Sequence, residues 1–120
     1  MVNLSMRDKA ELLRQLAHPV RIMILQELSE GVKCVTDMQD LLDIPQPNVS
    51  QHLLVLRRNR IVDYYEDGPL RCYYLLRPNL VAELLRFLSG EYPVVARDRE
   101  SVRRDGQLRE RRSEKRVACN

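Results

Sequence analysis

The amino-acid sequence predicts a mainly α-helical fold of the α+β class, in which one small β-hairpin accompanies a set of helices. Three observations lead to this prediction. Leucine and isoleucine recur at helical spacing through much of the first 90 residues. A proline-rich turn over residues 43–47 separates two helical segments, and two strand-like runs lie shortly after them. The expected order is therefore four helices, two strands and a fifth helix.

The first two helices are expected to be separated by a break at residues 17–19. Ser5 can cap the first helix, and Asp8 three residues later completes an approximate capping box. Pro19 suits the first position of the second helix, because proline lacks the N–H that would be unpaired there. Gly31 is expected to end the second helix.

The third helix is expected over residues 35–43, with Thr36 as its cap. Three apolar residues form its expected buried side: Met38, Leu41 and Leu42. Pro45 cannot continue this helix, whereas Pro47 can begin the next one. The segment therefore predicts two helices joined by a tight turn.

The fourth helix, expected from Pro47 to about Asn59, has two sides of different chemistry. Three apolar residues fall within a narrow arc: Val49, Leu53 and Leu56. The opposite arc holds Asn48, Gln51, Val55 and Arg58, with Ser50, His52 and Arg57 on the flanks. This pattern is typical of a helix that packs on a core with one side and lies in the major groove of DNA with the other.

A β-hairpin is expected after the fourth helix. The runs Ile61–Tyr65 and Leu70–Leu76 are rich in β-branched and aromatic residues, and Glu66–Pro69 between them contains a strong turn dipeptide. A last helix with a leucine stripe is expected to close near Gly90. A hairpin directly after a helix–turn–helix predicts a winged helix-turn-helix domain.

Length and charge divide the chain into a domain, residues 1–95, and a basic C-terminal tail, residues 96–120. The domain has 11 basic and 12 acidic residues, whereas the tail has 9 and 5. The tail has almost no apolar periodicity, so we expect it to be flexible, with weak helix as the alternative. No apolar run could span a membrane and the start is not a signal peptide, so a cytoplasmic protein is expected.

Residues 8–90 resemble the ArsR family of bacterial winged-helix repressors. The segments that carry the resemblance are LAHPVRIMILQEL, Val35-Thr36-Asp37-Met38, QPNVSQHL at residues 46–53 with Leu56-Arg57, and Asp67-Gly68 with Tyr73-Tyr74-Leu75-Leu76. The resemblance implies a homodimer whose first and last helices form the interface. It also implies double-stranded operator DNA as the partner and an inducer that releases it.

The predicted DNA contacts follow from the chemistry of the fourth helix and of the wing. Asn48 and Gln51 can pair with adenine, and Arg58 with guanine. Ser50 and Arg57 could hold phosphates. The full candidate set is Gln46, Asn48, Ser50, Gln51, His52, Arg57, Arg58 and, on the wing, Arg71. For His52 two roles stay open, a DNA contact or a hydrogen bond within the turn.

The three cysteines, Cys34, Cys72 and Cys119, form neither a disulfide framework nor a four-ligand zinc site. Cys34 is the candidate sensor, because its place beside a helix start favours the thiolate. Cys72 is expected to pack on its strand. Cys119 could swing onto Cys34, in its own chain or the partner's, and complete a site for As(III) or another soft metal. The arsenic-sensing members carry a second cysteine where this chain has Thr36.

The leading hypothesis is a homodimeric repressor that an inducer releases from operator DNA. The inducer stays open between arsenite or another soft metal, oxidation or persulfidation of Cys34, and a small organic ligand. The alternative is a winged-helix interaction module without DNA readout, which the net charge of −1 over residues 1–95 and the acidic wing tip favour. An enzyme is rejected, because the sequence lacks a phosphate loop, a nucleophile–base arrangement and a metal constellation. No cofactor is required.

Overall fold

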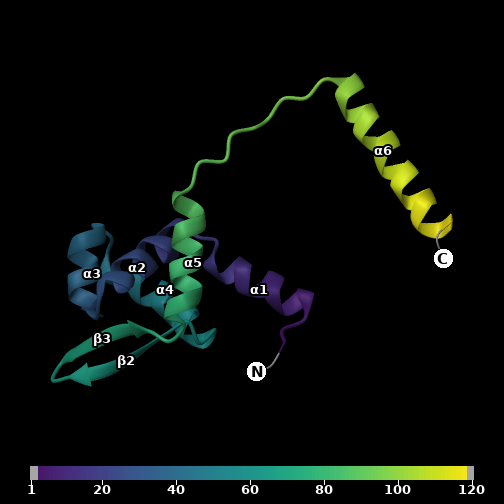
Figure 1. The fold of residues 1–120 in the computed structure, drawn as a ribbon. Helices are drawn as coiled ribbons and strands as arrows, with labels where there is room; N and C mark the ends of the chain where they lie inside the picture. Colours follow the sequence, from purple (N-terminus) through teal and green to yellow (C-terminus); the bar gives the residue numbers. More distant parts are fainter. Residues whose placement is uncertain (1–2, 119–120) are drawn as a thin grey trace. The chain divides into compact units, whose positions relative to one another are not determined.

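The computed structural model describes residues 3–118 and divides the chain into two compact units, residues 1–90 and 91–120. The first unit contains, in chain order, α1 (Met6–Leu16), α2 (Pro19–Glu30), β1 (Lys33–Cys34), α3 (Val35–Leu42), α4 (Gln46–Arg58), β2 (Val62–Asp67), β3 (Leu70–Leu75) and α5 (Pro78–Ser89) (Figure 1). The second contains α6 (Arg99–Ala118). The boundary lies at Gly90, whereas the sequence predicted residue 95. The predicted order is correct for five helices and two strands, and β1 and α6 are additional.

The sheet has three strands in the order β1-β3-β2, where the sequence predicted only a two-stranded hairpin. Lys33 and Cys34 pair antiparallel with Tyr73 and Cys72 of β3. A two-residue strand is too short to produce an alternating pattern, so only its pairing with β3 defines it. The consequence is that the start of α3 is attached to the wing.

The wing strands reach further toward the tip than predicted, because Glu66 and Asp67 belong to β2 instead of the turn, whereas Ile61 and Leu76 lie outside the strands. Asp67 pairs with Leu70, which leaves a two-residue turn of Gly68 and Pro69. Gly68 has φ +59°, a left-handed conformation that glycine adopts without steric cost. In Figure 1 the hairpin extends from the helices at the lower left, with α3 above it.

The core of the first unit lies between α2, α3, α4, the sheet and α5. Its fully buried side chains are Ile24, Leu25, Met38, Val49, Leu53, Leu56, Ile61, Val62 and Val81. Burying one such aliphatic side chain contributes about 1.5–3 kcal/mol relative to an exposed one. Leu41 was predicted to be buried, but it is 56% exposed. Val35 and Met38 are the buried residues of this short helix, and Leu42 is only partly buried against the core.

The helix starts agree with the sequence in two of three cases. The Ser5 hydroxyl accepts the Asp8 N–H at 3.1 Å, as predicted. Pro19 occupies the first turn of α2, and the His18 ring caps it by accepting the Val20 N–H at 3.1 Å. Thr36 was predicted to cap α3, but the cap position is Cys34. Pairing of Cys34 with β3 holds its backbone extended, so the helix begins directly after it.

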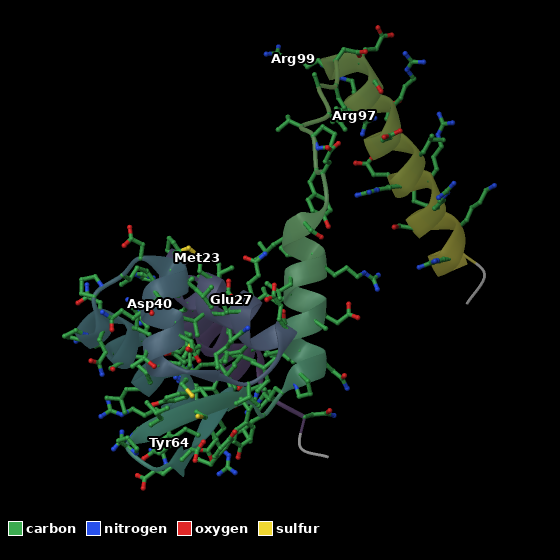
Figure 2. The ribbon with its side chains drawn as sticks, turned by 90° about the vertical axis from the view of Figure 1, so that its left-hand side faces the viewer. Met23, Glu27, Asp40, Tyr64, Arg97 and Arg99 are labelled. Carbon is green, nitrogen blue, oxygen red and sulfur yellow. The ribbon has the colours of Figure 1, made fainter. Side chains whose placement is uncertain are left out.

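The second unit is a charged helix. The Asp98 carboxylate accepts the Ser101 N–H at 2.7 Å near the start of α6, and Arg97 pairs with Asp105 at 2.6 Å. Figure 2 labels Arg97 and Arg99 where this unit begins and shows charged side chains around its helix. The tail is thus helical over Arg99–Ala118, the alternative that the sequence left open. Within the described range, no helix is both long and apolar enough for a membrane span.

Candidate nucleic-acid interface

α4 is anchored by one apolar side and leaves its polar residues exposed. Val49, Leu53 and Leu56 have no exposed surface, as the predicted arc requires. Pro45 precedes the helix, and Gln46 and Pro47 form its first turn, one residue earlier than predicted. The candidate residues Gln46, Asn48, Gln51, Arg57 and Arg58 are exposed, and Ser50 is half-buried. The helix therefore presents donors and acceptors of the kind that read bases and phosphates.

The exposed residues of α4 separate into two groups. Gln46, Ser50, Leu54 and Arg57 follow one another at helical spacing and line a groove between α4 and the wing. Asn48, Gln51 and Arg58 are not part of that groove, although Arg58 lines a second hollow with Leu54 and Arg57. The wing-facing group suits backbone contacts, whereas the other group is available to base edges.

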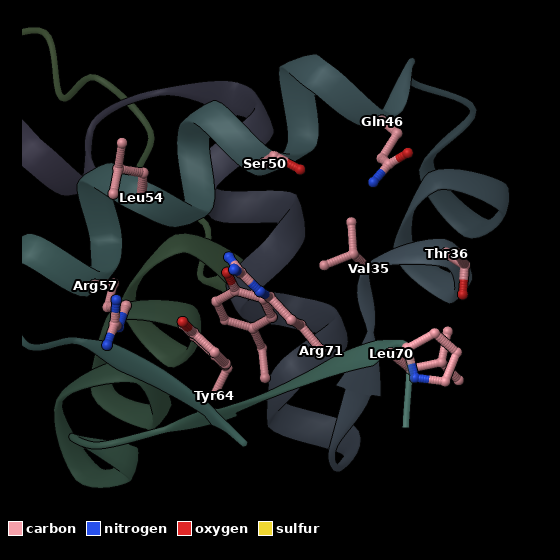
Figure 3. A pocket seen from close by; sticks show the side chains of 11 residues that line it. Val35, Thr36, Gln46, Ser50, Leu54, Arg57, Tyr64, Leu70 and Arg71 are labelled. Atoms are coloured by element: carbon pink, nitrogen blue, oxygen red, sulfur yellow. The ribbon is translucent and has the colours of Figure 1, made fainter. Parts of the chain in front are cut away.

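The groove between α4 and the wing has a volume of about 430 Å³ (Figure 3). Val35 and Thr36 from the start of α3 form one part of its lining, and wing residues form the rest: Tyr64, Pro69, Leu70, Arg71 and Tyr73. In Figure 3 the Arg71 side chain lies beside the Tyr64 ring, with Arg57 on the helix nearby. The groove thus brings together two arginines that are distant in the sequence.

The aromatic ring of Tyr64 makes cation–π contacts with both Arg57 and Arg71. The guanidinium carbon of Arg57 lies 4.4 Å from the ring centroid, and that of Arg71 lies 4.8 Å from it. Cation–π contacts of this kind keep long side chains in place at modest cost. Glu66 lies opposite Arg71 in the register of the two strands, so a negative charge of the wing tip stands near Arg71.

Asp63 forms an ion pair with Arg57, the predicted phosphate contact. The Arg57 Nε donates to the Asp63 Oδ1 at 3.1 Å, and the same oxygen accepts the Tyr64 N–H at 2.8 Å. The Tyr64 N–H and then the Arg57 guanidinium lower the pKa of Asp63, so its carboxylate stays charged at neutral pH. Because the two side chains are 47% and 38% exposed, this ion pair is partly screened by water and contributes little to stability.

His52 packs against α2. The Arg21 Nε donates to the His52 Nδ1 at 3.2 Å, and the His18 ring lies 4.3 Å from the His52 ring between centroids. Burial lowers the pKa of His52, and the neighbouring His18 and Arg21 lower it further. These contacts support the hydrogen-bonding role among the two that the sequence left open for His52. The partner is Arg21 on α2, however, and not a group of the turn.

Cys34 is not the activated thiolate that its place at a helix start predicted. A hydrogen bond to the Cys72 thiol, and then burial, raise the pKa of Cys34 to about 11. Asp37 and Asp67 act in the same direction through their negative charges. The contact with Cys72 thus outweighs the helix terminus. Cys72 is buried, as predicted, but it packs directly against the proposed sensor.

The predicted metal pair, Cys34 and Cys119, cannot be assembled from the described part of the chain, because Cys119 lies outside it. Within residues 3–118 no three His, Cys, Asp or Glu side chains come together as a metal site. The described thiols that lie together are Cys34 and Cys72, which is one fewer than the three thiolates that trivalent arsenic favours.

Three residues of the site escaped the sequence analysis: Asp63, Tyr64 and Cys72 as a partner of Cys34. Strand alternation could have placed Tyr64 and Glu66 on one face of β2. Nothing in the sequence pairs Asp63 with Arg57, because the pairing depends on the angle at which β2 leaves α4. The Cys34–Cys72 contact depends on β1, which the pattern did not reveal.

Comparison with known proteins decides the family. The model of the family described as "Bacterial regulatory protein, arsR family" matches residues 18–64. The biofilm growth-associated repressor of Xylella fastidiosa is 44% identical over 81 residues, which cover 68% of this chain and 70% of that protein. The chain belongs to the ArsR family.

Other relatives agree with this assignment. The transcriptional repressor SmtB of Mycobacterium tuberculosis is 52% identical to this ArsR-family chain over 58 residues, or 48% of the chain and 43% of SmtB. The chain therefore matches less than half the length of SmtB. The crystal structure of the transcriptional repressor BigR from Xylella fastidiosa superposes with a TM-score of 0.62 at 32% identity, covering 72% of this chain and 91% of BigR. The predicted winged helix-turn-helix fold is confirmed.

Proposed function

We propose that this ArsR-family chain is a transcriptional repressor that binds operator DNA as a homodimer through α4 and the wing. The observation that carries the proposal is the anchored α4, whose polar residues are exposed beside a groove that contains Arg57 and Arg71. A helix of 13 residues with a free polar side fits the major groove. The names of SmtB and BigR as repressors support the same role.

Each polar residue of the interface takes a distinct part in this proposal. Asn48 and Gln51 read base edges, and Arg58 adds a contact to guanine. Ser50, Arg57 and Arg71 hold phosphates along the groove, with Gln46 at its α4 end. Arg57 exchanges Asp63 for a phosphate when DNA binds.

The homodimer is proposed on the apolar surface of the terminal helices of the first unit. Met6 and Leu13 are 78% and 60% exposed and lie seven residues apart, so they share one face of α1. Leu88 on α5 is 46% exposed. A second copy of the chain would cover these side chains and place two α4 helices about one turn of DNA apart.

The inducer is proposed to act through thiol chemistry at Cys34. Arsenite or another soft metal is one candidate inducer, with Cys34 and Cys119 as the predicted ligand pair and Cys72, which contacts Cys34, as an additional soft ligand. The family assignment supports control by an inducer. Val35 and Thr36, which follow Cys34, line the groove between α4 and the wing, so a reaction at Cys34 would take place next to the proposed DNA-binding surface.

A pair of variants tests DNA binding at the level of bases and phosphates. DNA from the upstream region of the chain's own gene is titrated and affinity is followed by fluorescence anisotropy at several salt concentrations. Gln51→Ala should relax the base preference by about 1–3 kcal/mol at one position. Arg57→Ala should weaken binding to every sequence and reduce the salt slope by about 1.

The alternative, an interaction module without DNA readout, makes the opposite prediction. A module would show no binding to this DNA at low salt, and neither Gln51→Ala nor Arg57→Ala would change any affinity. Either result would rule out the assignment of α4 as a recognition helix. Lys9→Ala serves as a matched control for the loss of a cation, because it lies exposed on α1.

A further inference from the structure

Two thiols face each other across the sheet. Cys34 of β1 pairs directly with Cys72 of β3 in an antiparallel ladder. Facing residues in such a ladder have Cα atoms about 4.5–5.5 Å apart. This separation lies inside the range of about 4.4–6.8 Å that a disulfide spans without backbone movement. The pairing therefore meets the main geometric requirement for a bond between the two sulfurs.

The two cysteines differ in their access to solvent. Cys34 is half-buried, whereas Cys72 is only 3% exposed and has Tyr65 of β2 on its other side. A reagent in solution therefore reaches Cys34 first, and Cys72 is placed to react with whatever forms there. This is the arrangement of an attacked thiol with a resolving thiol beside it.

We propose that Cys34 and Cys72 are a redox-active pair that peroxide-type oxidants close to an intramolecular disulfide. The Cys34 thiolate attacks one peroxide oxygen, the O–O bond breaks, and Cys34 sulfenic acid forms with release of water after protonation. The Cys72 thiolate then attacks the Cys34 sulfur and displaces hydroxide, which takes up a proton. Two thiols and one hydrogen peroxide give one disulfide and two waters.

The surroundings of Cys34 make the first step slow at neutral pH. Cys72 of β3, Asp37 of α3, and Asp67 and Tyr65 of β2 are the titratable groups around it. Cys72, then burial, and then the charges of Asp37 and Asp67 raise the pKa of Cys34 to about 11, so little thiolate is present at pH 7. Since the thiolate is the reactive form, the rate of oxidation should increase with pH up to that value.

The disulfide would act on the groove between α4 and the wing. Val35 and Thr36 follow Cys34, Arg71 and Tyr73 flank Cys72, and all four line that groove. Bond formation replaces a hydrogen-bonded contact between thiols with a covalent bond of about 2.05 Å. The bond then fixes the start of α3 to the wing strand, which restricts the adjustment by which Arg71, next to Cys72, would meet a DNA phosphate. This consequence rests on the proposed function, whereas the disulfide itself does not.

The chemical part is tested on the full chain carrying Cys119→Ser, so that only the two paired thiols remain. Reduced protein is treated with hydrogen peroxide at pH 7 and pH 9, alkylated with N-ethylmaleimide and mapped by mass spectrometry. Both thiols should disappear together as a cross-linked peptide that joins Cys34 to Cys72 forms. This reaction should be faster at pH 9 than at pH 7. Dithiothreitol should restore both. The matched variants Cys34→Ser and Cys72→Ser cannot give this peptide.

Two results would overturn the pairing. One is oxidation of Cys34 to sulfinic or sulfonic acid while Cys72 remains alkylatable. The other is a disulfide that links Cys34 residues of two chains. Circular dichroism of each serine variant establishes that it is folded before it is treated.

The regulatory part is tested by anisotropy on the same DNA with reduced and oxidised Cys119→Ser protein. Oxidation should weaken binding by at least about fivefold, the lower end of common allosteric coupling, and Cys72→Ser should not respond. Unchanged affinity of the cross-linked protein would overturn the coupling. Reduced protein that fails to bind DNA contradicts the proposed function alone, because the peptide map does not depend on DNA.

Discussion

Arg57 has two intramolecular contacts that bear on its use as a phosphate contact. Its guanidinium stacks on Tyr64 and pairs with Asp63. The stacking leaves the N–H groups available, whereas the ion pair occupies the Nε. In the proposed function, Tyr64 therefore holds the arginine in position for a DNA phosphate, and Asp63 competes with that phosphate for it.

Asp63→Asn should strengthen DNA binding. The amide oxygen can still accept the Tyr64 N–H, but the negative charge beside Arg57 is gone. Arg57 then reaches the same phosphate without giving up a charged partner, so the affinity should increase and the salt slope should not decrease. Anisotropy over a salt series measures both quantities. Asp40→Asn makes the same charge change at an exposed site on α3, and equal effects of the two variants would contradict a specific role of Asp63.

His52 should make the fold less stable in mild acid. Burial lowers its pKa below the usual 6.5, so the unfolded chain takes up a proton before the folded chain does. The free energy of unfolding should therefore fall as the pH drops below about 6.5, and it should level off below the folded pKa. Urea unfolding between pH 7.5 and pH 5 measures this. His52→Gln keeps an acceptor for Arg21 without a titrating ring, and an equally steep profile would contradict the assignment.

The C-terminal end of α4 contains one residue in a strained backbone conformation, Arg60. The Ile61 N–H donates to the Leu56 carbonyl at 3.0 Å and the Arg60 N–H to that of Arg57 at 2.9 Å. These two bonds, with Leu56 and Ile61 both fully buried, form a Schellman motif. Its left-handed position is usually glycine, but here Arg60 has φ 56°. The motif directs the chain from α4 into the wing.

Arg60→Gly should therefore stabilise the protein by about 1 kcal/mol, because glycine has no Cβ to strain in this conformation. The Arg60 N–H donates to the Arg57 carbonyl and the Arg60 carbonyl accepts from the Arg77 Nε, and the substitution keeps both of these backbone groups. Urea unfolding measures the free energy. Arg58→Gly, at the last residue of the helix, should destabilise by up to about 1 kcal/mol. A loss of stability in both variants would argue against strain at Arg60.

Sequence patterns predicted a helix or strand correctly where its caps and buried positions depend only on residues nearby in the sequence. Ser5, Pro19 and the buried arc of α4 depend on neighbours within one helix, and all three were predicted correctly. β1 and the cap at Cys34 were missed, because both depend on pairing with β3, nearly 40 residues later. Leu41 was wrongly predicted to be buried, because helical periodicity shows which side of a helix is apolar but not how far the core extends along it.

At the scale of the whole molecule, assembly should depend on α1. Leu13→Glu places a charge on the exposed apolar face and should convert the dimer to monomers, which sedimentation velocity measures. DNA affinity should fall in parallel, because two half-sites are no longer bound together. Leu41→Glu makes the same change at an exposed leucine of α3 and should remain dimeric. A monomeric parent chain would contradict the proposed interface.

The sequence by itself determined the class of fold, the family resemblance and the polar set on α4. These follow from helical spacing, turn chemistry and short motifs, all of which are local along the chain. Only the tertiary structure decided which groups meet: Asp63 with Arg57, Arg21 with His52, and Cys34 with Cys72. The charge state of a side chain depends on neighbours brought near by folding, so the chemistry of Cys34 could not be read from its position beside a helix start.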